Sequence, residues 1–275
     1  ILNIIFDPIM IFGLFGMPAM GIKGAAAATV FGQIVATLLA GWINHRKNTD
    51  VRIRVKGFKP HRHTIGIIYQ VGVPSIIMQS ISSVMTFGMN KILVVFSETA
   101  VAVFGVYFKL QSFIFMPVFG LNNGMIPIIA YNYGARSKKR IMQTIRLSIA
   151  IAVGIMLIGF AIFQLVPHLL LGLFQVDSNM LSIGVPALKT ISLSFLFAGY
   201  CIIIGSVFQA LGNGVYSLIV SVARQLVCIL PLAYFFSKTF GLQAVWYAIP
   251  LAEISSVVIG SLLFLRIYRK KIRGL

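Results

Sequence analysis

Charged side chains are scarce in this sequence of 275 residues, and acidic ones are almost missing. Asp, Glu, Lys and Arg make up 10% of the residues, whereas about 25% is usual for a soluble globular domain. Asp and Glu together number only 5. This composition excludes an ordinary water-soluble enzyme. It also excludes a disordered chain, because disorder requires low hydrophobicity, and here 59% of residues are hydrophobic with a mean hydropathy of +0.96.

Several chemical signatures are missing as well. The two cysteines, Cys201 and Cys228, lie in apolar segments without a CxxC spacing, so they are interpreted as packing residues and no zinc site is indicated. The sequence has no HExxH, GxSxG or GxGD motif and no carboxylate pair on one helix. We therefore predict that the protein is not an enzyme and has no catalytic residues and no cofactor.

Long runs without a formal charge are what the sequence has instead. Five such runs lie at residues 24–44, 65–90, 110–135, 147–176 and 190–223. Each reaches the roughly 20 residues that a helix needs to cross a hydrocarbon core. The fold class that they predict is an all-α polytopic membrane protein. We expect its helices near residues 1–14, 18–43, 66–96, 100–132, 141–172, 181–211, 215–237 and 242–267.

The basic residues support this membrane topology. Of the 23 Lys and Arg residues, most gather in three clusters, at 46–62, 136–146 and 266–273. Basic loops remain on the cytoplasmic side of a membrane, and the helix count places all three clusters on one side. We therefore expect a cytoplasmic C-terminus and no binding of nucleic acid, although the net charge is +18.

A weak internal repeat indicates two bundles in the same orientation. Residues 21–33 (GIKGAAAATVFGQ) are similar to residues 241–253 (GLQAVWYAIPLAE), and an apolar segment with a proline, Pro8 or Pro231, precedes each. We expect about four helices of the first bundle to lie before residue 1, so that these residues alone do not transport. The predicted domains are 1–44, the last two helices of the N-lobe; 45–65, a basic cytoplasmic inter-lobe loop; and 66–275, a C-lobe of six helices.

Five segments carry a family resemblance. They are NIIFDP at 3–8, GIKGAAAAT at 21–29, GVP at 72–74, MPVFGLNNGMIPIIAYNYGA at 116–135 and FQALGNG at 208–214. In this order and spacing the chain resembles the MATE family of multidrug efflux transporters, and within it the bacterial DinF/MepA-like branch. The resemblance implies a fold of two lobes with six helices each, of which the first is incomplete here.

Asp7 is the most informative charge in an apolar segment. It lies one helical turn after Asn3, and Pro8 frees a backbone carbonyl nearby. From these residues alone, a cation or proton site and a structural role at a helix break are equally supported. The resemblance favours the former, since it implies a coupling-cation site of Asn3, Asp7 and Thr29. The coupling ion is expected to be H⁺ or Na⁺, and Na⁺ at Asp7 is the only metal considered.

Three other charges need an explanation at membrane depth. Glu253 is interpreted as a structural partner of Arg224 on the preceding helix, with binding of a cationic drug as the alternative. The role of Lys109 is left open. Some relatives carry acidic residues at positions that correspond most nearly to Ser82 and Tyr200. Neither residue is acidic here, so a cation site in the C-lobe is not expected.

We expect the substrate cavity to be apolar and lightly polar, with soft methionine and aromatic surfaces that suit many ligands. Its predicted lining residues are Gln79, Ser82, Met116, Tyr200 and Gln209. A GxxxG pattern at Gly120 and Gly124 is interpreted as a close helix contact, and the flanking prolines predict a kinked helix.

The resemblance and the residues together predict a secondary active multidrug efflux transporter. It would export small organic, cationic compounds in exchange for H⁺ or Na⁺ by alternating access, as a monomer in the lipid bilayer of the bacterial plasma membrane. The alternative is a lipid-linked oligosaccharide flippase of the same superfamily. A flippase cavity needs several basic residues, and only Lys109 and Arg224 are available, so this alternative ranks second.

Overall fold

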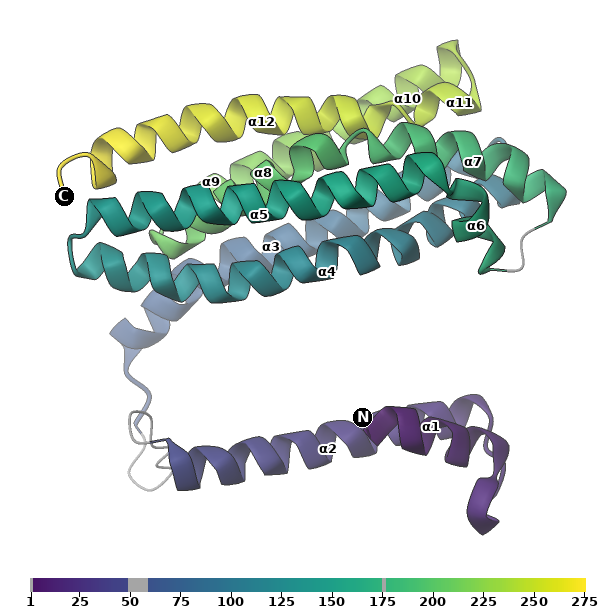
Figure 1. The fold of residues 1–275 in the computed structure, drawn as a ribbon, viewed down its shortest axis with the longest axis horizontal. Helices are drawn as coiled ribbons and strands as arrows, with labels where there is room; N and C mark the ends of the chain where they lie inside the picture. The colour runs from purple at the N-terminus through teal and green to yellow at the C-terminus, as the bar shows by residue number, and fades with distance from the viewer. Residues whose placement is uncertain (1, 49–58, 175–176) are drawn as a thin grey trace. The chain divides into compact units, whose positions relative to one another are not determined.

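A computed structural model describes residues 2–48, 59–174 and 177–275 (Figure 1). Within these ranges the chain is almost entirely helical and contains no strand, which confirms the all-α prediction. The chain divides into two compact units, Ile1–His61 and Arg62–Leu275, and each is treated by itself. Part of the predicted basic loop, residues 49–58, lies outside the described ranges.

Unit 1 is a pair of helices that turn back on each other. The helix α1 (Leu2–Phe12) contains Pro8, a short turn η1 (Leu14–Gly16) follows, and α2 (Ile22–Lys47) returns along α1. The approach is close because Gly24 has no side chain: a Cβ atom there would overlap the carbonyl group of Met10. A glycine at this position is therefore required for the packing of α1 on α2.

Unit 2 contains the other membrane-spanning helices. Their bounds are α3 (Arg62–Leu93), α4 (Glu98–Gly134), α5 (Lys138–Leu165), α6 (Pro167–Gly172), α7 (Ser178–Ser192), α8 (Phe195–Ala210), α9 (Gly214–Val222), the π turn η2 (Ala223–Ile229), α10 (Leu230–Thr239), α11 (Leu242–Val245), α12 (Ala248–Ile267) and the π turn η3 (Tyr268–Ile272). The predicted helices agree with these bounds to within several residues. Among the described residues, 6 helices are long and apolar enough to cross a membrane, or up to 7 if the bent pair α7–α8 counts as one span.

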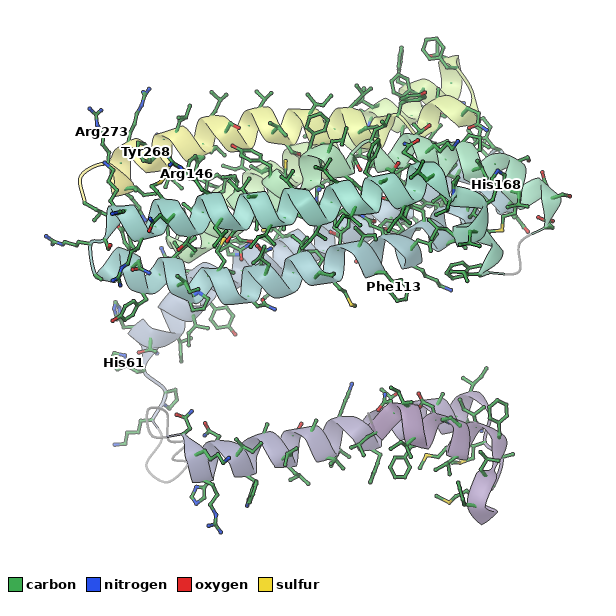
Figure 2. The ribbon with its side chains drawn as sticks, viewed as in Figure 1. His61, Phe113, Arg146, His168, Tyr268 and Arg273 are labelled. Carbon is green, nitrogen blue, oxygen red and sulfur yellow. The ribbon has the colours of Figure 1, made fainter. Side chains whose placement is uncertain are left out.

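The outer surface and the ends of unit 2 fit a bilayer. Large apolar side chains such as Phe113 are exposed on the outside of the helices, where lipid would cover them. Arg146 and Arg273 lie at one end of the unit and His168 lies at the other (Figure 2). The chain is thus a multi-pass membrane protein, with basic residues of two predicted clusters at the same end.

The core of unit 2 depends on close packing of helix backbones. In the apolar environment of a membrane, van der Waals contact between helices replaces the hydrophobic effect as the driving force, and small residues permit it. Gly199 of α8 lies against the backbone of Ala152 of α5, where a Cβ would come within 3.0 Å of the carbonyl group. By contrast, a Cβ at Gly120 or Gly124 would meet nothing within 4 Å. The GxxxG pattern therefore makes no close helix contact within the described residues, contrary to the prediction.

Two irregular stretches interrupt the regular helices of unit 2. The helices α7 and α8 meet at an angle of 51°, and α9 continues into the π turn η2 just before Pro231. Proline cannot donate a backbone hydrogen bond, so a shifted pattern beside it has a physical cause. The helix α4 continues through Pro117 and Pro127, and the kink expected at these prolines stays a prediction.

Candidate functional site

Unit 2 has an open cavity of about 740 Å³ between its helices. Side chains from α3, α4, α8, α9, η2 and α12 line it. Most are Phe, Met, Ile and small polar residues, and among the described residues of the lining only Arg224 and Glu253 carry a formal charge. Known ligand cavities of this size are lined by apolar and aromatic groups with a few polar ones, so the cavity can hold a small organic molecule.

An ion pair joins two helices at this cavity. The Nη1 atom of Arg224, in η2, donates to both carboxylate oxygens of Glu253, in α12, at 3.1 Å and 3.4 Å. The side chain of Glu253 is 4% exposed, whereas that of Arg224 is 32% exposed. The π turn brings the guanidinium to this place, because its wider winding changes the direction of the side chains that follow Val222.

Further polar groups surround the pair. Tyr107 of α4 and Cys201 of α8 both line the cavity and interact electrostatically with Glu253 and Arg224. Beside Arg224, the buried amide of Gln225 donates to the hydroxyl of Ser221 at 2.7 Å. The pair thus belongs to a polar cluster within an apolar bundle.

Asn122 is a buried amide at the same cavity. The residue is 6% exposed, and its Oδ1 atom accepts no hydrogen bond within the described part of the chain. A buried polar atom without a partner costs free energy, so a donor group that reached it would be stabilised. Asn122 was missed at the sequence level. The two successive amides at 122 and 123, within an apolar helix, were the signal that could have found it.

Four of the five predicted lining residues lie at the cavity: Gln79 and Ser82 of α3, Met116 of α4 and Gln209 of α8. Tyr200, the fifth, is not one of them. Its hydroxyl shares a hydrogen bond of 2.8 Å with Ser261 of α12, and it is not among the lining residues. Its neighbours Cys201 and Ile202 face the cavity instead, because adjacent residues of a helix point in different directions.

Lys109 is also absent from the lining. It is exposed, and its Nζ atom lies 5.7 Å from the centre of the Phe174 ring. This position allows a cation–π contact on the outside of α4. Arg224 is therefore the only basic residue among those that line the cavity.

The predicted coupling residues lie on unit 1. The amide oxygen of Asn3 lies against Gly32 of α2, at the side of α1 that packs on α2. The Oδ1 atom of Asp7 is buried and has no hydrogen-bond partner within the described residues. The hydroxyl of Thr29 donates to the carbonyl of Ala25 in its own helix at 2.9 Å, and the residue is exposed.

Asn3 and Asp7 thus lie on consecutive turns of α1, as predicted, whereas Thr29 lies beside the contact rather than within it. Gly24, Ala28 and Gly32 form the part of α2 that faces α1, and Thr29 follows this row by one residue. Within the described ranges, no group of three His, Cys, Asp or Glu side chains could hold a metal ion.

Comparison with known proteins gives one consistent result. Residues 74–235 match the model of the MatE family. The chain is 29% identical over 252 residues to the multidrug export protein MepA of Staphylococcus haemolyticus (strain JCSC1435), and 29% identical over 255 residues to MepA of Staphylococcus aureus (strain MRSA252). Each alignment covers 92% of this chain and 54% of the relative, so the chain spans about half the length of these relatives.

Solved structures agree with this result. One is an outward-facing multidrug resistance MATE family transporter of the MOP superfamily, with a TM-score of 0.89 and 28% identity over 100% of this chain and 61% of that one. Another is a MOP superfamily transporter from Pyrococcus furiosus described by the reverse polarity of its binding pocket. Its TM-score is 0.88 at 28% identity, over 97% of this chain and 60% of that one.

Proposed function

Because this chain belongs to the MatE family, we propose that it forms part of a secondary active multidrug efflux transporter. The transporter exports small organic compounds from a bacterial cell in exchange for H⁺ or Na⁺, by alternating access. Its basic clusters, and with them the C-terminus, lie on the cytoplasmic side of the plasma membrane. It works as a monomer, has no cofactor and does not bind nucleic acid.

The observation that carries this proposal is the cavity of unit 2. It is lined by aromatic rings and methionines, including Phe104, Phe115 and Met116, together with serine and amide side chains. Flexible Met side chains adapt to ligands of different shape, and rings attract cationic groups. Such a cavity fits a transporter that accepts many organic compounds.

The coupling site that we propose lies on unit 1, at Asn3, Asp7 and Thr29. The support for it is the buried Oδ1 atom of Asp7, which has no partner among the described residues. A carboxylate in an apolar environment is costly unless it is neutralised by a proton or a cation. Either ion would bind there with a favourable free energy, and its release would leave the carboxylate charged and unpaired again.

Transport by the full-length protein in liposomes tests this function. Release of the fluorescent cation rhodamine 6G is followed under a pH gradient and, separately, under a Na⁺ gradient. We expect one gradient to drive transport in the wild type and Asp7→Asn to lose this dependence. The matched control is Glu98→Gln, since Glu98 is exposed in the first turn of α4 and should not affect coupling.

The outcomes separate the parts of the proposal. Gradient-driven transport by Asp7→Asn at the wild-type rate would contradict the coupling site on unit 1. Failure of the wild type to move any organic compound, cationic or zwitterionic, under either gradient would contradict efflux itself. The flippase alternative is not favoured, because a pyrophosphate lipid needs several basic residues, and among the described residues that line the cavity only Arg224 is basic.

A further inference from the structure

The charges of the cavity in unit 2 specify its ligands further. We propose that Arg224 recognises a carboxylate group on the transported compound, so that the cavity selects zwitterionic and acidic amphipathic compounds over simple cations. Arg224 is then a specificity-determining residue, and Glu253 is a positioning residue. The inference rests on the proposed function and names the substrate class for the cavity.

The first support is the unequal exposure of the pair. The Arg224 side chain is 32% exposed and lines the cavity, whereas that of Glu253 is only 4% exposed. Both side chains line the cavity, and a ligand therefore meets the guanidinium more readily than the carboxylate. A simple cation would have to displace Arg224 before it could reach Glu253, whereas an anionic group meets a donor directly.

The second support is the number of free donors on Arg224. A guanidinium carries five N–H donors in a planar fork that matches the two oxygens of a carboxylate. Only its Nη1 atom bonds to Glu253, and no bond of Nε or Nη2 is recorded within the described part of the chain. These atoms can hold a second carboxylate while the first remains in place.

Glu253 accounts for the presence of Arg224 in an apolar bundle. An unpaired guanidinium at membrane depth is costly, so the carboxylate from α12 neutralises it and fixes the direction of the side chain. The charges of the lining then sum to zero, so the preference for one sign of ligand charge comes from the unequal exposure of the two partners. The positive end of a zwitterion can instead lie over the rings of Phe104 and Phe115.

Asn122 gives an independent indication that the cavity receives a polar ligand. This amide is more than nine-tenths buried and lines the cavity, yet its oxygen has no hydrogen-bond partner among the described residues. A ligand N–H or O–H group would satisfy it. With the free guanidinium donors, it makes a cavity that offers both a donor and an acceptor to one compound.

The test uses two dyes that differ in one group. Rhodamine 6G is an ethyl ester and carries only a positive charge, and rhodamine 19 is the same dye with a free carboxylate. Binding and transport of both are measured with the full-length protein in liposomes. The variants are Arg224→Lys, which keeps the charge but loses the fork, and Arg224→Gln/Glu253→Gln, which removes both charges together. The matched control is Lys109→Gln, which removes an exposed cation outside the cavity.

We expect the affinity for rhodamine 19 to fall about tenfold to a hundredfold in both variants, because a charge-assisted hydrogen-bond pair is lost. Affinity for rhodamine 6G should change less than about twofold, and Lys109→Gln should alter neither dye. An equal loss for both dyes, or no loss for rhodamine 19, would overturn the inference and leave efflux intact. A wild type that moves neither dye would overturn both.

Protein folding is checked separately by size-exclusion chromatography and by the unfolding temperature in detergent. If the double variant does not fold, Arg224→Lys decides the question, since it keeps the ion pair with Glu253. A folded Arg224→Lys protein that binds rhodamine 19 as tightly as the wild type does would show that the fork is not used.

Discussion

Asp7 of unit 1 and Glu253 of unit 2 each lie well inside an apolar helix, and their surroundings differ. In unit 2, Glu253 is paired with Arg224 at 3.1 Å. In unit 1, Asp7 has a buried oxygen without a partner in the described part of the chain. A carboxylate that is paired with an arginine side chain stays neutralised, whereas an unpaired carboxylate can bind and release a proton or a metal cation. The difference supports the proposal that Asp7, and not Glu253, belongs to the coupling site.

Removing one member of the ion pair should have the largest effect on stability. Arg224→Met leaves the Glu253 carboxylate buried and unpaired, so we expect a loss of about 3–5 kcal/mol in the free energy of unfolding. The double variant Arg224→Met/Glu253→Met should be near neutral, because both buried charges are gone. Denaturant titration in detergent measures both. Equal loss in the two proteins would mean that packing, and not charge, holds the pair.

A change at the α1–α2 contact should come next. Gly24→Ala places a Cβ against the carbonyl of Met10, and we expect a loss of about 1–3 kcal/mol from overpacking. The control is Gly120→Ala, where a Cβ meets nothing within 4 Å and helix propensity should give a gain of up to about 1 kcal/mol. The same titration compares them. A neutral Gly24→Ala would show that α1 can move away from α2.

Loss of a single hydrogen bond between α8 and α12 should have a smaller effect. Tyr200→Phe removes the bond to Ser261, with an expected loss of about 0.5–1.5 kcal/mol and no change in the substrates transported. Tyr234→Phe is the control, since Tyr234 is 59% exposed. A change in the range of substrates transported by Tyr200→Phe would show that this residue takes part in substrate binding.

The smallest effect on stability should come from Asp7. Asp7→Asn removes a carboxylate whose buried Oδ1 atom has no hydrogen-bond partner among the described residues. We therefore expect a change of less than about 1 kcal/mol in the free energy of unfolding. Gradient-driven transport, in contrast, should fall to the background of empty liposomes. A large destabilisation by Asp7→Asn would remove the contrast with Glu253 and make Asp7 structural.

The helices were predictable because a run of some 20 uncharged residues has few other uses. The contact of Arg224 with Glu253 could also be predicted from the sequence. Lone opposite charges on successive membrane helices gain by meeting, and the structure brings these two together. Both predictions use one-dimensional information, namely where charge is present and where it is not.

The direction of individual side chains was harder to predict. Tyr200 lies in α8, whose orientation is set by the 51° bend after α7, and Arg224 lies in a π turn that does not follow the ordinary 100° step. Asn122 lies between the two prolines of α4, and the sequence does not show which side of this helix faces the cavity. Pro231 marks a place where the helix is irregular, but it does not by itself give the direction of each side chain in the π turn.

The pairing of Arg224 with Glu253 also has a consequence for the membrane potential. Moving one elementary charge through 100 mV changes the energy by about 2.3 kcal/mol. The described lining of the cavity in unit 2 carries one positive and one negative charge next to each other. A change of access from one side of the membrane to the other therefore moves no net charge of this lining through the membrane potential. The voltage dependence of the transport cycle would then arise from Asp7 with its ion, and from the charge of the compound carried.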